Sequence, residues 1–439
     1  MPRRLPAFRR QYCKGVTPGT TDAGRGRPGA SADWHGHSHG SSDYRRLLAA
    51  LFFAGIATFA QLYSPQAVLA HLADDLRISA ADSALVVSAS TIGLAIGVLP
   101  WSVVADRIGR VRAMAIAVGA ATVFGLAVPF APTFSLLLTG RLVEGLMLGG
   151  VPAIAIAYLS EEIEPRHAAR AAGTYVAGTS IGGLLGRLVA GPLSEFSSWR
   201  VGVFAVAVLC AISAVLFIVL VPASRGFVPR PPGRRDRDAT VPHDSLLHLL
   251  RENLRSKRML ALYAQGFLLM GGFVALYNYL GFRLGGDPFG LPQSIVSLVF
   301  VAYLGGTWSS AQAGILAARF GRWAVLLGSL AMMTAGVLLT LSPLLAVTLI
   351  GVLLATAGFF AAHAVASGWT GVEATVGRAQ ASSLYNLSYY AGSSLFGWLG
   401  GVFFVTWGWA GTAGMVTGLA LVAAVLSVLL LRPARSSLP

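Results

Sequence analysis

Long apolar stretches separated by short polar segments dominate the chain. Each stretch provides the roughly 20 residues that a transmembrane helix needs. Uninterrupted apolarity favours helices over the strands of a membrane barrel, which alternate apolar and polar positions. The pattern therefore predicts an all-α membrane protein with twelve transmembrane helices. The expected spans are 46–70, 83–104, 111–131, 134–159, 167–193, 200–222, 257–281, 291–317, 322–342, 343–367, 379–401 and 404–431.

A polar segment divides these spans into two sets of six. Residues 223–256 are rich in Pro and Arg, and we expect them to form a cytoplasmic linker. An N-terminal half at 46–222 and a C-terminal half at 257–431 follow from this division. The tails are 1–45 and 432–439. The first tail is Arg-rich and lacks the apolar core of a signal peptide, which predicts a disordered cytoplasmic segment.

The composition excludes an ordinary soluble protein. Only 12% of the residues are charged and 55% are hydrophobic, whereas soluble domains carry about 25% charged residues. The net charge is +15. With the amino terminus inside, 28 of the 33 Lys and Arg residues lie on the inner side and three on the outer side. This asymmetry predicts a multi-pass protein of a bacterial-type inner membrane with both termini cytoplasmic.

The basic charge does not indicate nucleic-acid binding, because no basic run is interleaved with exposed aromatic residues. In the first tail, His35, His37 and His39 alternate in a way that can ligate Zn, Ni or Cu. The alternative, which we favour, is a tail that binds metal weakly or not at all. No phosphate-binding loop, nucleophile elbow or zinc-protease motif occurs. We therefore expect no metal, no cofactor and no enzyme activity.

A nine-residue pattern occurs once in each half. SVVADRIGR at Ser102–Arg110 follows the second span, and GILAARFGR at Gly314–Arg322 follows the eighth, 212 residues later. Each copy ends in a Gly turn with Arg residues on the cytoplasmic side. A repeat of this kind indicates two pseudo-symmetric halves.

These residues resemble the signature loop of the major facilitator superfamily. The resemblance extends over residues 44–431, with twelve spans in two halves of six around a long central loop. Arg141-x-x-Glu144-Gly145 in the fourth span is similar to a motif of the proton-coupled members. Segments around Tyr63 and Tyr277 are similar to bacterial exporters of the multidrug and sugar-efflux kind.

The resemblance implies a gating role for the repeated loop, which latches the cytoplasmic side while the transporter faces outward. The implied gating residues are Asp106, Arg107, Gly109, Arg110, Arg112, Arg319, Gly321 and Arg322. The second copy has Ala318 where the first has Asp106. We therefore expect the gate contacts of the two halves to differ.

Charged residues inside the spans are functional candidates, because a charge in the bilayer core costs several kcal/mol. Glu144 is the only acidic residue well inside a span, and Arg141 lies one turn away on the same helix face. Arg187 in the fifth span is expected at a similar depth. Glu144 either binds and releases the coupling proton or forms a fixed pair with an arginine that holds the fourth and fifth spans together. His363 in the tenth span either titrates as well or is simply hydrogen-bonded.

In this superfamily the first, fourth, seventh and tenth helices line a central cavity. Polar and aromatic residues on these spans and on the eleventh are candidates for substrate contact, since sites for amphipathic solutes combine aromatic walls with a few polar groups. The alternative for Tyr277 is that its side chain anchors the helix at the membrane interface. The candidates are Gln61, Tyr63, Gln265, Tyr277, Asn278, Tyr385, Asn386 and Tyr389.

The sequence thus predicts a secondary active transporter that alternates access by rocking its two halves, a rocker-switch mechanism. We expect proton-coupled efflux of a small amphipathic compound or metabolite. A proton-coupled importer or a facilitator remains an alternative; a receptor would not need the repeated gating loop. The expected partners are a small-molecule substrate, protons and the lipid bilayer, and we expect a functional monomer.

Overall fold

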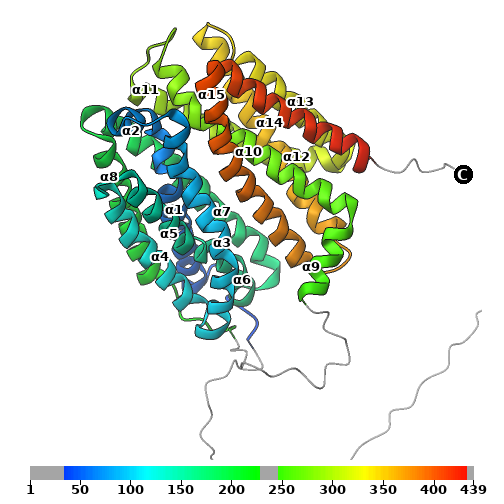
Figure 1. Ribbon diagram of the computed structural model, residues 1–439. Helices are drawn as coiled ribbons and strands as arrows, with labels where there is room; N and C mark the ends of the chain where they lie inside the picture. Colours follow the sequence, from blue (N-terminus) through cyan, green and yellow to red (C-terminus); the bar gives the residue numbers. More distant parts are fainter. Residues whose placement is uncertain (1–33, 228–245, 433–439) are drawn as a thin grey trace, which may run out of the picture.

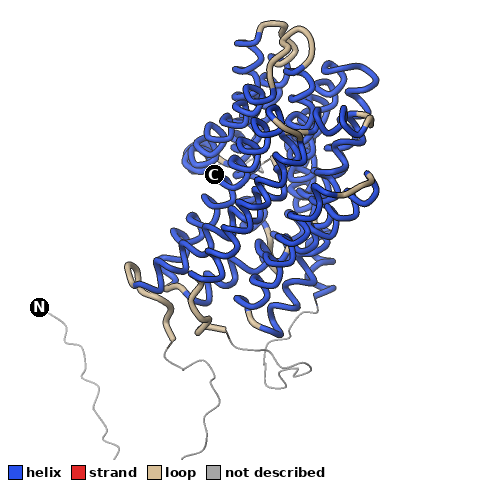
Figure 2. Tube along the Cα trace, turned by 90° about the vertical axis from the view of Figure 1, so that its left-hand side faces the viewer, coloured by secondary structure: helices blue, strands red, loops and turns tan. Residues whose placement is uncertain are grey.

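The computed structural model describes residues 34–227 and 246–432. These residues are almost entirely helical and are connected by short loops (Figure 2). The helices form two bundles, one from each half of the chain, which lie side by side in Figure 1. The only β-type pairing among the described residues is an isolated bridge between His37 and Ile163.

The N-terminal half provides six crossings. Helices α5 and α6 form a single crossing that is interrupted at Gly149, and the short α2 connects the first two crossings. The helices are α1 (Ser42–Tyr63), α2 (Leu69–Leu76), α3 (Ala80–Ile108), α4 (Arg110–Ala127), α5 (Phe134–Leu148), α6 (Gly150–Glu162), α7 (Pro165–Phe196) and α8 (Trp199–Leu220). Short 3₁₀ turns follow α1 at Ser64–Ala67 and α4 at Val128–Phe130.

The C-terminal half repeats this arrangement. Its helices are α9 (Leu246–Arg255), α10 (Lys257–Gly285), α11 (Gln293–Leu298), α12 (Ala302–Phe320), α13 (Arg322–Leu339), α14 (Leu345–Glu373) and α15 (Arg378–Leu430). A 3₁₀ turn, Val299–Val301, joins α11 to α12. Within α15, Trp407 and Gly408 are not helical, and the chain turns back there. The indole of Trp409 donates to Thr340 at one end of α13, and Ser427 accepts from Trp323 at the other.

Eleven helices in the described residues are long and apolar enough to cross a membrane. The last of them has 51 residues and is broken at Trp407 and Gly408, so it crosses twice. The predicted twelve crossings are therefore confirmed. Polar caps set where several of them begin, because a side-chain oxygen satisfies one of the free N–H groups of the first turn. The capping residues are Ser41, Ser79, Thr133, Ser198 and Ser256.

Two of the expected boundaries need correction. The predicted disordered tail was drawn to residue 45, but α1 already begins at Ser42, and Asp43 in its first turn suits the positive end of the helix dipole. Before it, the Trp34 indole donates to the Glu161 carbonyl. The predicted linker 223–256 contains helix α9, which the sequence analysis missed because α9 is short and polar on one face.

The halves are joined at one end of the molecule, near α2 and α11 (Figure 1). There the Gln66 side chain donates to Asn278 over 2.7 Å, and the Ser294 amide donates to Glu195 over 2.6 Å. We call the other end, where α3 and α12 finish and α10 begins, the basic end, since it carries Arg107, Arg258 and Arg319. In the described ranges no hydrogen bond or ion pair joins the halves at the basic end.

Close helix approach depends on glycine at specific contacts. A Cβ added to Gly392 of α15 would overlap the Phe267 carbonyl oxygen of α10, whereas one added to Gly414 would meet nothing within 4 Å. Both positions are helical. Small residues at such contacts let membrane helices pack closely.

We expect Gly392→Ala to lower the free energy of unfolding by about 1–3 kcal/mol, because α10 and α15 must move apart. Gly414→Ala is the matched control and should leave stability unchanged or slightly higher. Thermal unfolding of the purified variants in detergent measures both. Equal unfolding temperatures for the two variants would contradict the packing described.

Candidate functional site

A cavity of about 700 Å³ lies between the two halves. It is lined by α1 and α7 from the first half and by α10, α12, α14 and α15 from the second. Along α14 it reaches Gly368, close to the basic end of that helix. Aromatic side chains form a large part of its wall, and none of the lining residues is Asp or Glu. The aromatic lining residues are Phe59, Tyr63, Phe273, Tyr303, Phe359, Phe360 and Tyr389.

The set of lining helices differs from the expected one. The fourth crossing, α5 and α6, contributes nothing to this cavity, whereas the fifth and eighth, α7 and α12, line much of it. The reason is that α5 packs closely against α3: a Cβ on Gly145 would overlap the Ser90 carbonyl oxygen. That packing keeps the polar face of α5 inside the N-terminal bundle.

Of the predicted cavity residues, Tyr63 and Tyr389 line the cavity, and so do His363 and Arg187. The amides of Gln61 and Gln265 instead donate to backbone carbonyls of Ala121 and Ala423. Those amides are used in helix packing, which the sequence pattern does not distinguish from substrate contact. The predicted residues outside the lining are Gln61, Gln265, Tyr277, Asn278, Tyr385 and Asn386.

The cavity lining includes one histidine with a defined partner. His363 Nδ1 lies 2.9 Å from the Tyr385 hydroxyl. Its ring stacks on Phe359 and lies 4.8 Å from the ring of Tyr389, centre to centre. His363 is thus both hydrogen-bonded and part of the cavity wall.

Arg141 and Glu144 form a buried ion pair in α5. Their side chains are 1% and 0% exposed, and Arg141 Nη1 lies 2.6 Å from Glu144 Oε2. The same guanidinium donates to the backbone carbonyls of Gln61 and Leu62 at the end of α1, over 3.3 and 2.8 Å, and to that of Val86 in α3, over 3.1 Å. Because the last carbonyls of a helix have no partner within it, Arg141 acts as a cap for α1.

The second carboxylate oxygen of Glu144 has no hydrogen-bond partner among the described residues. The same holds for Gln61 Oε1. The two side chains meet beside Gly125, where an added Cβ would overlap the Gln61 amide and lie 3.0 Å from Glu144 Oε1. Two acceptors without a donor are costly in a buried site. A proton on Glu144 would supply the missing donor.

Arg187 does not pair with Glu144. Its Nε and Nη2 donate to Gln66 Oε1 over 2.8 and 2.5 Å, and Nη1 donates to the Gly183 carbonyl over 2.6 Å. The rings of Tyr63, Phe300 and Tyr303 surround its guanidinium at 4.7–4.9 Å. The interpretation of a glutamate–arginine pair holding the fourth and fifth spans together is therefore wrong, since the partner of Glu144 lies on its own helix.

Comparison with known proteins identifies the family. A sequence model of the Major Facilitator Superfamily matches residues 48–309. The inner membrane transport protein YnfM of Escherichia coli K12 is 41% identical over 377 residues, which cover 86% of this chain and 88% of YnfM. The MFS-type transporter YybF of Bacillus subtilis 168 is 38% identical, covering 90% of this chain and 95% of YybF. The chain belongs to the major facilitator superfamily.

A member of this superfamily is a secondary transporter of the membrane and not an enzyme. A solved structure of a bacterial homologue of the human lysosomal transporter Spinster, inward-facing and occupied, superposes with a TM-score of 0.71. It covers 90% of this chain and 98% of its own, at 16% identity, so this likeness concerns the fold alone.

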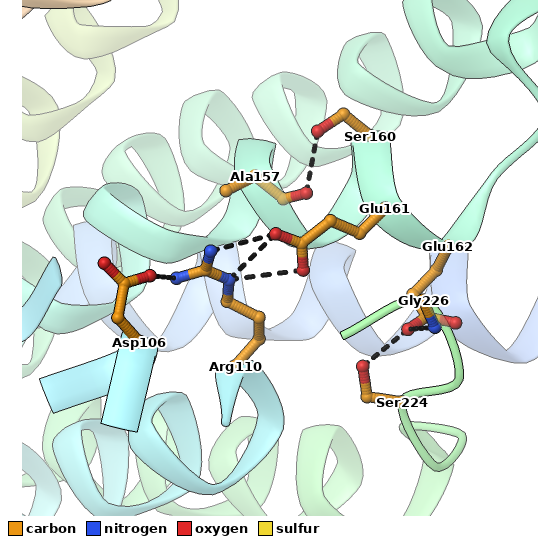
Figure 3. Close-up of polar contacts among 8 residues, drawn as sticks. All are labelled: Asp106, Arg110, Ala157, Ser160, Glu161, Glu162, Ser224 and Gly226. Atoms are coloured by element: carbon orange, nitrogen blue, oxygen red, sulfur yellow. Dashed lines mark hydrogen bonds and ion pairs between the residues drawn. The ribbon is translucent and has the colours of Figure 1, made fainter. Parts of the chain in front are cut away.

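The superfamily loop at the basic end is held by a cluster of charges (Figure 3). Arg110 Nη1 lies 2.6 Å from Asp106, and its Nε and Nη2 donate to Glu161 at the end of α6. Gly109 joins α3 to α4 with a φ of 97°, a conformation that favours glycine. Arg107 and Arg112 are exposed.

The second copy of the loop lacks this cluster. Gly321 has the same positive φ, 85°, but Arg319 lies over the ring of Phe320 and no ion pair involves Arg319 or Arg322 among the described residues. Ala318 in place of an acid explains the difference. The unequal loops agree with the expectation, while the gating role of these residues stays a prediction.

The sequence analysis missed two glutamates at the end of α6. Glu161 pairs with Arg110, and the buried Glu162 accepts from the Ser224 hydroxyl and from the amides of Arg225 and Gly226 (Figure 3). Two adjacent acidic residues at the end of an apolar span were the sequence feature that could have identified this site. Together they attach α6 to the gating loop and to the segment that leaves α8.

No group of three or more His, Cys, Asp or Glu residues in 34–227 and 246–432 is placed to hold a metal ion. His35, His37 and His39 are part of that range. His37 is buried, and its amide donates to the Glu162 carbonyl.

We expect Arg141→Met to lower the free energy of unfolding by about 3–5 kcal/mol, because it leaves Glu144 as an uncompensated buried charge. Adding Glu144→Gln should restore part of that loss by removing the charge. Thermal unfolding of the two single variants and the double variant gives the coupling between the sites. A double variant no more stable than Arg141→Met would contradict the ion pair.

Proposed function

We propose that this transporter exports a small amphipathic compound against proton entry, with Glu144 as the proton-binding group and both termini in the cytoplasm. The observation that carries the proposal is the fully buried Glu144 carboxylate, which has one oxygen in an ion pair and the other without a partner beside Gln61. The surroundings of Glu144 can accommodate both the charged and the protonated carboxyl group. The ion pair favours the charged form, and the free oxygens favour a proton.

A continuous set of contacts leads from Glu144 to the cavity. Arg141 holds the carbonyls of Gln61 and Leu62, and the next residue, Tyr63, lines the cavity beneath Arg187. When Glu144 takes up a proton, its attraction to Arg141 weakens, and the cap on α1 weakens with it. The end of α1 can then shift against the cavity wall, which couples the proton to the substrate.

The arrangement of the two halves supports alternating access. Hydrogen bonds join the halves at the end near α2 and α11 and between α3 and α15, where Ser88 and Thr91 contact Ser394, and the cavity extends toward the basic end. The excess of Lys and Arg supports a cytoplasmic position for the basic end. The described state is then inward-facing, which is the state in which an exporter takes up its substrate. Rocking of the halves would close the basic end and open the other.

We expect Glu144→Gln to abolish proton movement driven by substrate, because a carboxamide cannot take up the coupling proton. The variant is reconstituted in vesicles with an internal pH dye, and a panel of charged and neutral amphipathic solutes is applied. Exchange of labelled substrate across the membrane should persist, since it needs no net proton transfer. Glu252→Gln, which removes a half-buried carboxylate of α9 that pairs with Arg255, is the matched control and should couple like the wild type.

The sign of the pH change separates the alternatives. Protons moving opposite to the substrate give antiport, and protons moving with it give an importer. Substrate movement without protons gives a facilitator and contradicts the coupling role. A folded Glu144→Gln variant that couples like the wild type would also contradict it.

A further inference from the structure

Arg187 is a buried cation in the cavity wall without a charged partner. Its side chain is 2% exposed, and it lines the cavity from α7. The groups it contacts are all neutral: an amide oxygen of Gln66, a backbone carbonyl and three aromatic rings. No ion pair involves it among the described residues, and no acid lines the cavity. A charge at such a depth is expensive and marks a functional site by default.

The hydrogen bonds of Arg187 leave donors free. A guanidinium has five N–H groups. Nε and one N–H of Nη2 are used by Gln66 Oε1, and one N–H of Nη1 is used by the Gly183 carbonyl. One N–H therefore remains on each terminal nitrogen. Arginine binds carboxylates through paired donors of this kind, in bonds that are stronger than neutral ones.

The rest of the cavity suits an apolar body. Phe273 stacks on Phe359 with ring centres 3.9 Å apart, and Tyr303 and Phe360 lie edge-on to Phe273. The volume of about 700 Å³ is in the range of sites that enclose a small molecule. Arg187 is a single positive group at one place in this cavity, and the aromatic side chains surround the rest. This arrangement fits a ligand with one negative end and an apolar body.

We propose that the substrate is a small amphipathic anion whose carboxylate binds Arg187 and whose apolar part lies against the aromatic wall. This inference rests on the proposed function, in which the cavity is the substrate site, and it names the class of substrate. A neutral or cationic amphipathic compound would leave the buried Arg187 without a counter-ion, at a cost that the anion avoids.

Binding of the anion also affects the contacts between the halves near α2 and α11. Gln66 Oε1 accepts from Arg187, while its Nε2 donates to Asn278 in the other half. A carboxylate bound to the two free N–H groups of Arg187 neutralises the guanidinium, and this weakens the bonds that Arg187 donates to Gln66. Gln66 is then free to leave Asn278, which loosens one of the bonds that hold the halves together. Substrate occupancy thereby favours opening of that end.

The experiment compares acids with their uncharged amides. Purified protein is titrated with benzoate, 3-phenylpropionate and 4-phenylbutyrate and with the three matching amides, and binding is followed by thermal stabilisation. In the wild type we expect each acid that binds to do so at least 10-fold more tightly than its amide. Arg187→Gln should weaken acid binding about 10- to 100-fold and leave amide binding unchanged.

Two further variants complete the test. Arg187→Lys keeps the charge and should retain part of the preference for acids, and it replaces Arg187→Gln if that variant does not fold. Arg255→Gln removes an exposed arginine of α9 and should bind like the wild type. Equal binding of acids and amides by the wild type, unchanged acid binding in Arg187→Gln, or no binding of any acid would overturn the proposal. Proton coupling does not enter this assay, so its outcome is separate from that of the Glu144 experiment.

Discussion

The buried ion pair of Arg141 and Glu144 is the constraint on which the centre of the N-terminal half depends. A charge in this position is tolerated only with a partner, and removing one member of a buried pair costs several kcal/mol. Arg141 uses its remaining donors on the carbonyls where α1 ends and on α3. The pair therefore fixes three helices relative to one another. In our account, a change in the charge of Glu144 alters how α1 is held.

The second buried arginine has the opposite character. Arg187 is surrounded by neutral groups and faces the cavity, whereas Arg141 is neutralised inside the bundle. Helix α1 and the turn after it link the two sites, because Gln61 and Leu62 contact Arg141 while Tyr63 and Gln66 contact Arg187. In our account the proton acts at one end of this segment and the anionic substrate at the other. Gln66 extends the link to Asn278 and the second half.

The sequence was sufficient for the twelve crossings and the two halves, because the length of the apolar stretches encodes them directly, but it left open whether Glu144 pairs with Arg141 or with Arg187. It did not identify the partners of Arg187 or the contribution of α7 and α12 to the cavity. These depend on how helices rotate about their axes and pack, which glycine contacts such as Gly145 against Ser90 decide. The partnership of Glu161 with Arg110 was missed for the same reason, since 51 residues separate them.

The most direct test of the central claim is the protonation state of Glu144 itself. Infrared difference spectroscopy of the protein in vesicles, with Glu144→Gln as the reference, isolates the carbonyl stretch of this carboxyl group. The account predicts a protonated-carboxyl band that grows as the pH is lowered, shrinks when substrate binds and is absent from the variant. A Glu144 carboxyl whose spectrum does not change with pH or with substrate would contradict the account.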